Sequence, residues 1–304
     1  MRTPLAHRPR WQADLILGLV TLIWGGTFLL VQDSVRLTGP FSFLALRFLI
    51  GTLALGLTFP RRLARLTRRE LGTGGVIGLF LFGGYALQTL ALQLTTSAKV
   101  GFLTGLSVAM VPILAWGVLG QRPPVQAVVG TLLATMGLGL LSLGTGLAVQ
   151  VGPGEALGLG CAVCFAAQIV AISRWAPEVD ALNLAWVQVA TTAGLSALAA
   201  PLHGEPLVLP PAPVWLAALF LGCLATAFAF AVINSVQQFT TSTRAALIYA
   251  LEPVFAGLFG FWAGEPLTAV AWAGCGLIVL GMISGELHRP GTPVLAINET
   301  DQSR

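Results

Sequence analysis

The sequence predicts an all-α integral membrane protein with ten transmembrane helices, arranged as two inverted five-helix repeats. Only 9% of the 304 residues are charged and 56% are hydrophobic, with a mean hydropathy of +0.84, whereas a soluble protein needs more charges to cover its surface. Apolar runs long enough to cross a bilayer follow one another along the chain. The stretch Thr95–Lys99 returns 145 positions later as Thr240–Arg244, which indicates an internal duplication.

The ten predicted helices follow from the apolar runs. A bilayer core of about 30 Å is crossed by about 20 apolar residues. We place the spans at residues 13–31, 41–60, 73–94, 99–120, 125–146, 154–175, 182–202, 213–238, 244–263 and 267–285. Glycine and proline pairs separate several of them, as expected of connecting turns. These are Gly39-Pro40, Pro123-Pro124, Gly152-Pro153 and Pro210-Pro211, together with Glu265-Pro266.

The duplication divides the chain into an N-terminal repeat at 1–150, a C-terminal repeat at 151–290 and a disordered cytoplasmic tail at 291–304. Each repeat holds five predicted helices, and this odd number makes the second repeat enter the membrane from the opposite face. Lys and Arg gather on the cytoplasmic side of membrane proteins. With a cytoplasmic N-terminus, thirteen arginines lie on that side and only Arg36 and Lys99 on the other. Both termini are therefore expected in the cytoplasm.

The same features argue against several classes of function. The net charge of +4 is spread over loops instead of forming a basic stripe, so nucleic-acid binding is not expected. Cys161 and Cys164 lie in an apolar run, where packing is their expected role, and no metal site is predicted. The three histidines fall outside the predicted spans, so an intramembrane enzyme would lack its usual base. Inverted repeats instead supply two equivalent gates around a central site, as alternating access requires.

Several short motifs occur in order along both halves. They are Trp24-Gly25-Gly26-Thr27-Phe28, Arg47-Phe48, Thr95-Thr96-Ser97-Ala98, Glu252-Pro253, Gly264-Glu265 and the glycines Gly274 and Gly281. On these motifs the chain resembles the drug/metabolite transporter superfamily and within it the EamA family, and it is most similar to YddG-type exporters of aromatic amino acids. The resemblance implies ten helices in the inner membrane, no metal or organic cofactor, and export of amino acids or related metabolites. It also implies a central cavity lined by the first, third and fourth helices of each half.

The third and eighth predicted helices carry the first candidate substrate-binding residues. Tyr85 and Gln88 lie one turn apart on one helix face, and the 145-residue offset relates this face to the one that carries Phe230 and Asn234. Polar side chains in lipid either hold helices together or line a wet cavity. We expect Tyr85 and Asn234 to line a cavity, while both roles stay open for Gln88.

The first, sixth and ninth helices add four more candidates. Trp24 lies too deep for an interfacial aromatic belt, and Gln168 occupies the related face of the sixth helix; each could line the cavity or pack. Glu252 precedes Pro253, which removes a backbone donor and predicts a kink nearby. A carboxyl group within the bilayer is a functional hypothesis by default. Glu252 could carry a proton or, with Tyr249, bind a substrate ammonium group, and the alternative is a structural carboxyl.

Three basic residues also have more than one possible role. Arg47 in the second helix is expected to pair structurally with Asp33 or Glu252, and binding of a substrate carboxylate is the alternative. Lys99 and Arg244 begin the fourth and ninth helices at equivalent positions. We expect them to anchor the membrane interface, or else to draw carboxylates into a vestibule.

The sequence therefore predicts a secondary transporter and no enzyme activity. Its substrates would be amino acids with aromatic or other large apolar side chains and related metabolites, moved across the inner membrane by facilitated diffusion or exchange. The alternative is a proton-coupled drug or nucleotide-sugar carrier. The expected partners are a small-molecule substrate and the lipid bilayer, with a monomer as the simplest assembly.

Overall fold

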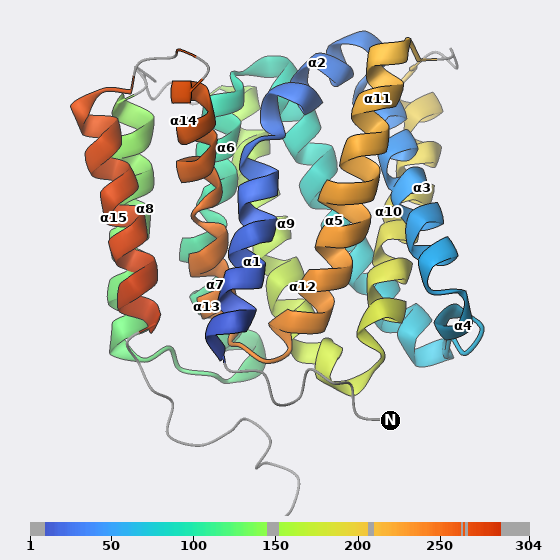
Figure 1. The fold of residues 1–304 in the computed structure, drawn as a ribbon, viewed down its shortest axis with the longest axis horizontal. Coiled ribbons are helices and arrows are strands. Elements are labelled where there is room, and N and C mark those ends of the chain that lie inside the picture. The colour runs from blue at the N-terminus through green and yellow to red at the C-terminus, as the bar shows by residue number, and fades with distance from the viewer. Residues whose placement is uncertain (1–9, 145–151, 206–209, 263, 265–266, 287–304) are drawn as a thin grey trace, which may run out of the picture.

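The computed structural model describes residues 10–144, 152–205, 210–262, 264 and 267–286. Within these ranges the chain forms helices and no strand, which confirms the predicted all-α fold (Figure 1). The expected cytoplasmic tail at 291–304 and the boundary between the repeats near residue 150 lie outside the described residues.

The N-terminal half forms eight helical segments. They are α1 (Arg10–Gly25), α2 (Phe28–Thr38), α3 (Pro40–Thr58), α4 (Pro60–Leu63), α5 (Arg68–Leu94), α6 (Ser97–Gly105), α7 (Ser107–Leu119) and α8 (Val125–Gly144). The C-terminal half follows the same plan. Its segments are α9 (Pro153–Trp175), η1 (Ala176–Glu178), α10 (Ala181–Leu202), α11 (Ala212–Phe220), η2 (Leu221–Phe228), α12 (Ala229–Gln237), α13 (Ser242–Tyr249), α14 (Glu252–Trp262) and α15 (Ala269–Glu286).

The number of membrane spans agrees with the prediction apart from two details. In the described part of the chain, eight helices are long and apolar enough to cross a membrane, and α1 with α2 gives a ninth if that bent pair is one span. The predicted tenth span is α15, a shorter apolar helix. The predicted first span at 13–31 is not continuous, because α1 and α2 meet at an angle of 45°.

The bend in the first span lies next to a close helix contact at Gly25. A Cβ there would lie 2.7 Å from the Cβ of Phe255 and 2.9 Å from the carbonyl oxygen of Glu252, so only glycine allows α14 to approach α1 this closely. The hydroxyl of Thr27 donates to the carbonyl oxygen of Trp24 at 2.7 Å. The chain therefore changes direction where α1 touches the other half.

The fourth helix of each half is also broken. Segments α6 and α7 meet at Leu106, and α13 and α14 meet at Ala250 and Leu251. Leu106 and Ala250 share the same backbone conformation, with φ −62° and ψ −11°. The break between α13 and α14 is the kink expected beside Pro253, whereas the break at Leu106 lies six residues before Pro112. The duplicated halves thus place a break at matching points.

The two halves contact each other at both sides of the molecule. At one side of the molecule α8 lies against α15, and at the other side α3 lies against α10 (Figure 1). The α8–α15 crossing is close because glycines face each other. A Cβ on Gly130 would lie 2.5 Å from the carbonyl oxygen of Gly281, and one on Gly137 would lie 2.6 Å from that of Gly274. Small residues allow such close helix crossings in membranes.

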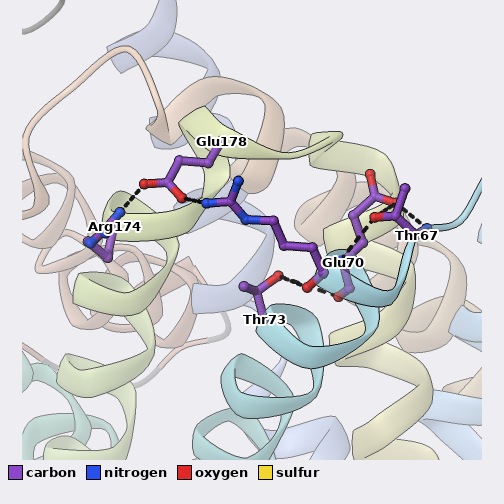
Figure 2. A network of polar contacts seen from close by, with 6 residues as sticks. Thr67, Glu70, Thr73, Arg174 and Glu178 are labelled. Atoms are coloured by element: carbon purple, nitrogen blue, oxygen red, sulfur yellow. Dashed lines mark hydrogen bonds and ion pairs between the residues drawn. The ribbon is translucent and has the colours of Figure 1, made fainter. Parts of the chain in front are cut away.

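Two buried carboxylates brace one half against the start of a helix in the other. Glu70 completes a capping box with Thr67 at the start of α5 and also accepts from the backbone N–H of Asp180 at 3.1 Å. Next to this brace Glu178 pairs with Arg69 and Arg174 (Figure 2).

At the opposite end of the molecule, Glu205 accepts from the backbone N–H groups of Phe41 and Ser42 at 2.9 and 2.6 Å. Each carboxylate therefore satisfies orphan N–H groups at a helix start. Each carboxylate therefore connects the start of the second helix of one half, α10 or α3, to the other half.

Candidate functional site

A cavity lies between the two halves, among the first, second, third and fourth helices. Six aromatic side chains line it: Trp24, Phe28, Tyr85, Phe165, Phe230 and Tyr249. Its polar lining consists of Thr27, Arg47, Gln88, Thr104, Ser107, Gln168 and Glu252. The volume open to water-sized molecules is about 70 Å³, which holds about five to seven waters.

The aromatic side chains form two groups. Trp24 of α1 contacts Phe230 and Tyr249 of the other half, with ring centroids 5.9 and 6.0 Å apart. Its indole N–H donates to the carbonyl oxygen of Ala225 at 2.9 Å. Tyr85 of α5 makes an edge contact with Phe165 of α9 at 5.2 Å. Each group contains residues of both halves, so the cavity forms only where the two halves pack against each other.

Hydrogen bonds hold the polar side chains of the lining. The amide of Gln88 donates to the Thr104 hydroxyl at 3.1 Å, and that of Gln168 donates to the side-chain oxygen of Gln188 at 3.1 Å. The Tyr249 hydroxyl donates to the side-chain oxygen of Gln237 at 3.1 Å. Buried polar groups that are held in this way keep a fixed orientation.

Arg47 lies in the wall of the cavity, although a peripheral structural role was predicted for it. Only 2% of the residue is exposed, and its Nε–H donates to the Thr226 hydroxyl at 3.0 Å. The guanidinium carbon lies 4.9 Å from the centre of the Tyr85 ring, a cation–π contact. Neither Asp33 nor Glu252 is within ion-pair distance of it among the described residues. The expected pairing is therefore replaced by contacts to a hydroxyl and an aromatic ring.

Glu252 begins α14 at the break in the ninth span, and its side chain lines the cavity. The break, at Ala250 and Leu251, lies directly before this residue. The Glu252 backbone touches α1 at Gly25. Within the described ranges no basic side chain pairs with the Glu252 carboxyl group. The lining therefore contains one cation and one carboxyl group that do not touch each other.

Asn234 does not line the cavity, in contrast to the prediction. It is completely buried, and its amide N–H donates to the carbonyl oxygen of Phe230 in the same helix at 2.7 Å. Thr89, its repeat partner, bonds in the same way to the carbonyl oxygen of Tyr85 at 2.8 Å. Both residues follow the aromatic residue by one turn, but helix packing covers them. Phe230 itself lines the cavity, with Ile233 beside it.

The remaining predicted residues Trp24, Tyr85, Gln88, Gln168 and Tyr249 all face the cavity. Thr104, Ser107 and Phe165 also line it and were not predicted. The repeat contained a signal for two of them, since the 145-residue offset relates Thr104 to Tyr249 and Ser107 to Glu252. The offset of 141 residues that relates Arg47 to Gln188 also relates Trp24 to Phe165, so the repeat contained a signal for this residue as well.

Lys99 and Arg244 lie beyond the two ends of the cavity and pair with carboxylates. The Lys99 ammonium group is 3.1 Å from Glu155 at the start of α9. Arg244 makes two contacts with Asp14 near the start of α1, one of them a hydrogen bond of 3.0 Å from Nε. Each pair joins the fourth helix of one half to the first helix of the other.

Comparison with known proteins agrees with this architecture. The model of the EamA-like transporter family matches the chain twice, at residues 11–143 and 152–284. An uncharacterized transporter of Archaeoglobus fulgidus is 35% identical over 90% of this chain and 85% of its own length. The aromatic amino acid exporter YddG of Ancylobacter novellus is 32% identical over 90% of this chain and 96% of its own. A solved crystal structure, 28% identical, has a TM-score of 0.75 over 92% of this chain and 98% of that chain.

Proposed function

Because the chain belongs to the EamA-like transporter family, we propose that it carries amino acids with aromatic or other large apolar side chains by alternating access. One observation carries this proposal: a cavity between the two halves combines six aromatic side chains with one carboxyl group, Glu252. The aromatic side chains offer an apolar surface to a substrate side chain. The carboxyl group offers a partner for its ammonium group.

The similarity to a protein named as an aromatic amino acid exporter supports this substrate class. The distribution of charge favours uniport or exchange over tight proton coupling, since Glu252 is the one carboxyl group in the described lining. Thirteen arginines on one side favour an inner-membrane protein with cytoplasmic termini. The repeats at 1–150 and 151–290 would then be the two bodies that move relative to each other.

The test uses purified protein in proteoliposomes. Uptake of labelled L-phenylalanine, L-tryptophan, L-leucine and L-alanine is measured with and without unlabelled amino acid inside. We expect saturable uptake that internal substrate accelerates, with phenylalanine and tryptophan preferred over alanine. Uptake that does not saturate would indicate a channel and contradict alternating access. Absence of uptake for all four amino acids would contradict the proposed substrate class.

A further inference from the structure

Arg47 is a buried arginine that has no carboxylate within ion-pair distance among the described residues. Removing a guanidinium group from water is costly unless a counter-ion and hydrogen bonds replace the water. Its Nε–H bonds to a neutral hydroxyl at 3.0 Å, and an aromatic ring lies below it. The planar fork of an arginine matches a carboxylate in a bidentate way. An anion that enters the cavity therefore finds a matching partner already in place.

The fold itself does not require a charge at this position. In this part of the chain the two halves match at an offset of 141 residues, which relates Arg47 to Gln188. Gln188 is completely buried and bonds to the neutral amide of Gln168. The second half thus builds the same helix with an uncharged residue. Arg47 also shares the cavity with Glu252, which comes from the other half, and the two do not form an ion pair. A guanidinium group and a carboxyl group therefore line one space without forming an ion pair.

We propose that Arg47 binds the substrate carboxylate while Glu252 binds the ammonium group, so that the site selects zwitterionic α-amino acids over amines. This inference rests on the proposed function. The substrate would connect the two halves, because Arg47 belongs to α3 and Glu252 to α14. The aromatic side chains would then receive the apolar part of the substrate.

The test compares three ligands of one shape: L-phenylalanine, 2-phenylethylamine without the carboxylate, and 3-phenylpropionate without the amine. Dissociation constants are measured by calorimetry on the purified protein. We expect Arg47→Gln to weaken phenylalanine and phenylpropionate by at least about tenfold and phenylethylamine by less than about twofold. Arg36→Gln, which removes an exposed arginine of α2, should leave all three values unchanged.

Equal weakening of phenylalanine and phenylethylamine by Arg47→Gln would overturn the proposal, because it would indicate a structural role. The proposal would also be overturned if neither phenylalanine nor phenylpropionate showed binding that depends on Arg47. If phenylpropionate binds through Arg47 while phenylalanine does not bind, the role of Arg47 stands and the proposed amino-acid substrate fails.

A second observation concerns the repeated stretch that ends in Lys99 and Arg244. In each copy a threonine caps the helix: Thr96 accepts from the backbone N–H of Lys99 at 3.4 Å, and Thr241 from that of Arg244 at 3.2 Å. The cap places a cation in the first turn of a helix, where the dipole disfavours it. Each cation instead pairs with a carboxylate on the first helix of the opposite half. Each copy of the stretch therefore contributes one ion pair between the two halves.

The two ion pairs lie at opposite ends of the cavity. The starts of α1 and α13, which hold Asp14 and Arg244, are at the lower end of the molecule in Figure 1, whereas α6, which begins near Lys99, is at the upper end. The side chains of both pairs are 10–22% exposed, so solvent screens them less than the surface pair of Arg62 and Asp180.

Both ion pairs are formed at the same time in this structure. Three of the four segments that carry them are interrupted, by the bend after Gly25 in the first span and by the breaks in the fourth and ninth spans. The fourth segment, α9 with Glu155, is continuous. Each interruption separates the part of a span that carries an ion pair from the part beyond the break.

We infer that the Lys99–Glu155 and Asp14–Arg244 pairs hold the two ends of the cavity closed, and that opening one end breaks only the pair at that end. This inference depends on alternating access but not on the identity of the substrate. Ser107, a small residue of the lining, provides a reporter position. The reporter is Ser107→Cys in a chain whose four cysteines are replaced by alanine, treated with a membrane-impermeant thiol reagent from either side.

We expect Arg244→Gln to raise the labelling rate by about fivefold from the side where α1 begins, and Lys99→Gln to do so from the other side. Exchanging the charges, with Asp14→Arg and Arg244→Asp together, should return the rate to within about twofold of the parent. Arg62→Gln removes a surface pair away from the cavity and serves as the control. If Arg244→Gln does not fold, Asp14→Asn tests the same end. Unchanged rates, or equal changes on both sides, would overturn the inference.

Discussion

The two ends of the cavity are built alike, whereas the residues that face each other across its centre are different. At each end a threonine-capped helix start presents a cation to a carboxylate of the other half. In the centre the repeat relates charged or aromatic residues to neutral ones. The related pairs are Arg47 with Gln188, Ser107 with Glu252, and Thr104 with Tyr249.

This difference separates the tasks of the two regions. In the proposed transport cycle the ends have the same task on both sides of the membrane, so the duplicated sequence would serve both. The proposed substrate has a carboxylate at one side and an ammonium group at the other, and two identical halves would present the same charge to both. Under this proposal, the difference between the halves in the centre gives the site a direction, while the repeat at the ends keeps the two gates equivalent.

The largest effect is expected from removing the charge that distinguishes the second half. Glu252→Gln should weaken binding of phenylalanine and of 2-phenylethylamine by at least about tenfold, because a charge-assisted hydrogen bond to the ammonium group is lost. Binding of 3-phenylpropionate should not weaken. Asp33→Asn, which removes an exposed carboxyl group of α2 outside the cavity, is the control, with less than about a twofold change. If 3-phenylpropionate loses as much affinity as the amine, Glu252 supports the structure instead of the ligand.

A smaller effect, on stability, is expected where the halves remain alike. Gly130 and Gly274 are repeat partners in α8 and α15, and a Cβ on either would lie 2.5 Å from a backbone atom of the facing helix. Alanine at either position should therefore lower the free energy of unfolding by about 1–3 kcal/mol. Thermal unfolding in detergent measures this loss.

The controls for this prediction lie on the same two helices. Gly139 and Gly276 have no atom within 4 Å of an added Cβ, so alanine there should leave the melting temperature unchanged or slightly raised. If the losses of stability at Gly130 and Gly274 differ by more than the measurement error, the two repeat partners do not contribute equally to the stability of this helix crossing.

The smallest effect is expected from single hydroxyl groups in the centre. Tyr249→Phe removes the donor to Gln237, and Thr104→Val removes the acceptor of Gln88. Each change leaves a buried amide with one partner fewer and should cost about 1 kcal/mol of stability. Since the amide of Gln237 still donates to the carbonyl oxygen of Ile169, we expect the smaller loss for Tyr249→Phe. Chemical denaturation would contradict this order if Tyr249→Phe were the more damaging change.

Local sequence patterns determined much of the architecture. Apolar run length predicted the helices, since hydrocarbon thickness fixes how many residues must be apolar. The repeated Thr-Thr-Ser stretch indicated the duplication, and it lies at the starts of α6 and α13, where Thr96 and Thr241 cap free backbone N–H groups. Proline after Glu252 predicted the break in the ninth span, because proline cannot donate a backbone hydrogen bond. Each of these signals acts within a few residues of the chain.

Only the tertiary structure decided which polar residues reach the cavity. Phe230 and Asn234 occupy neighbouring turns of α12, yet one lines the cavity and the other is covered. Arg47 faces the same space because α3 packs on η2, where Thr226 accepts its hydrogen bond from 179 positions away. The bend after Gly25 lies next to the point where α14 touches α1. Such contacts join segments far apart in the chain, and helix periodicity gives the faces of one helix but not the neighbour that each face meets.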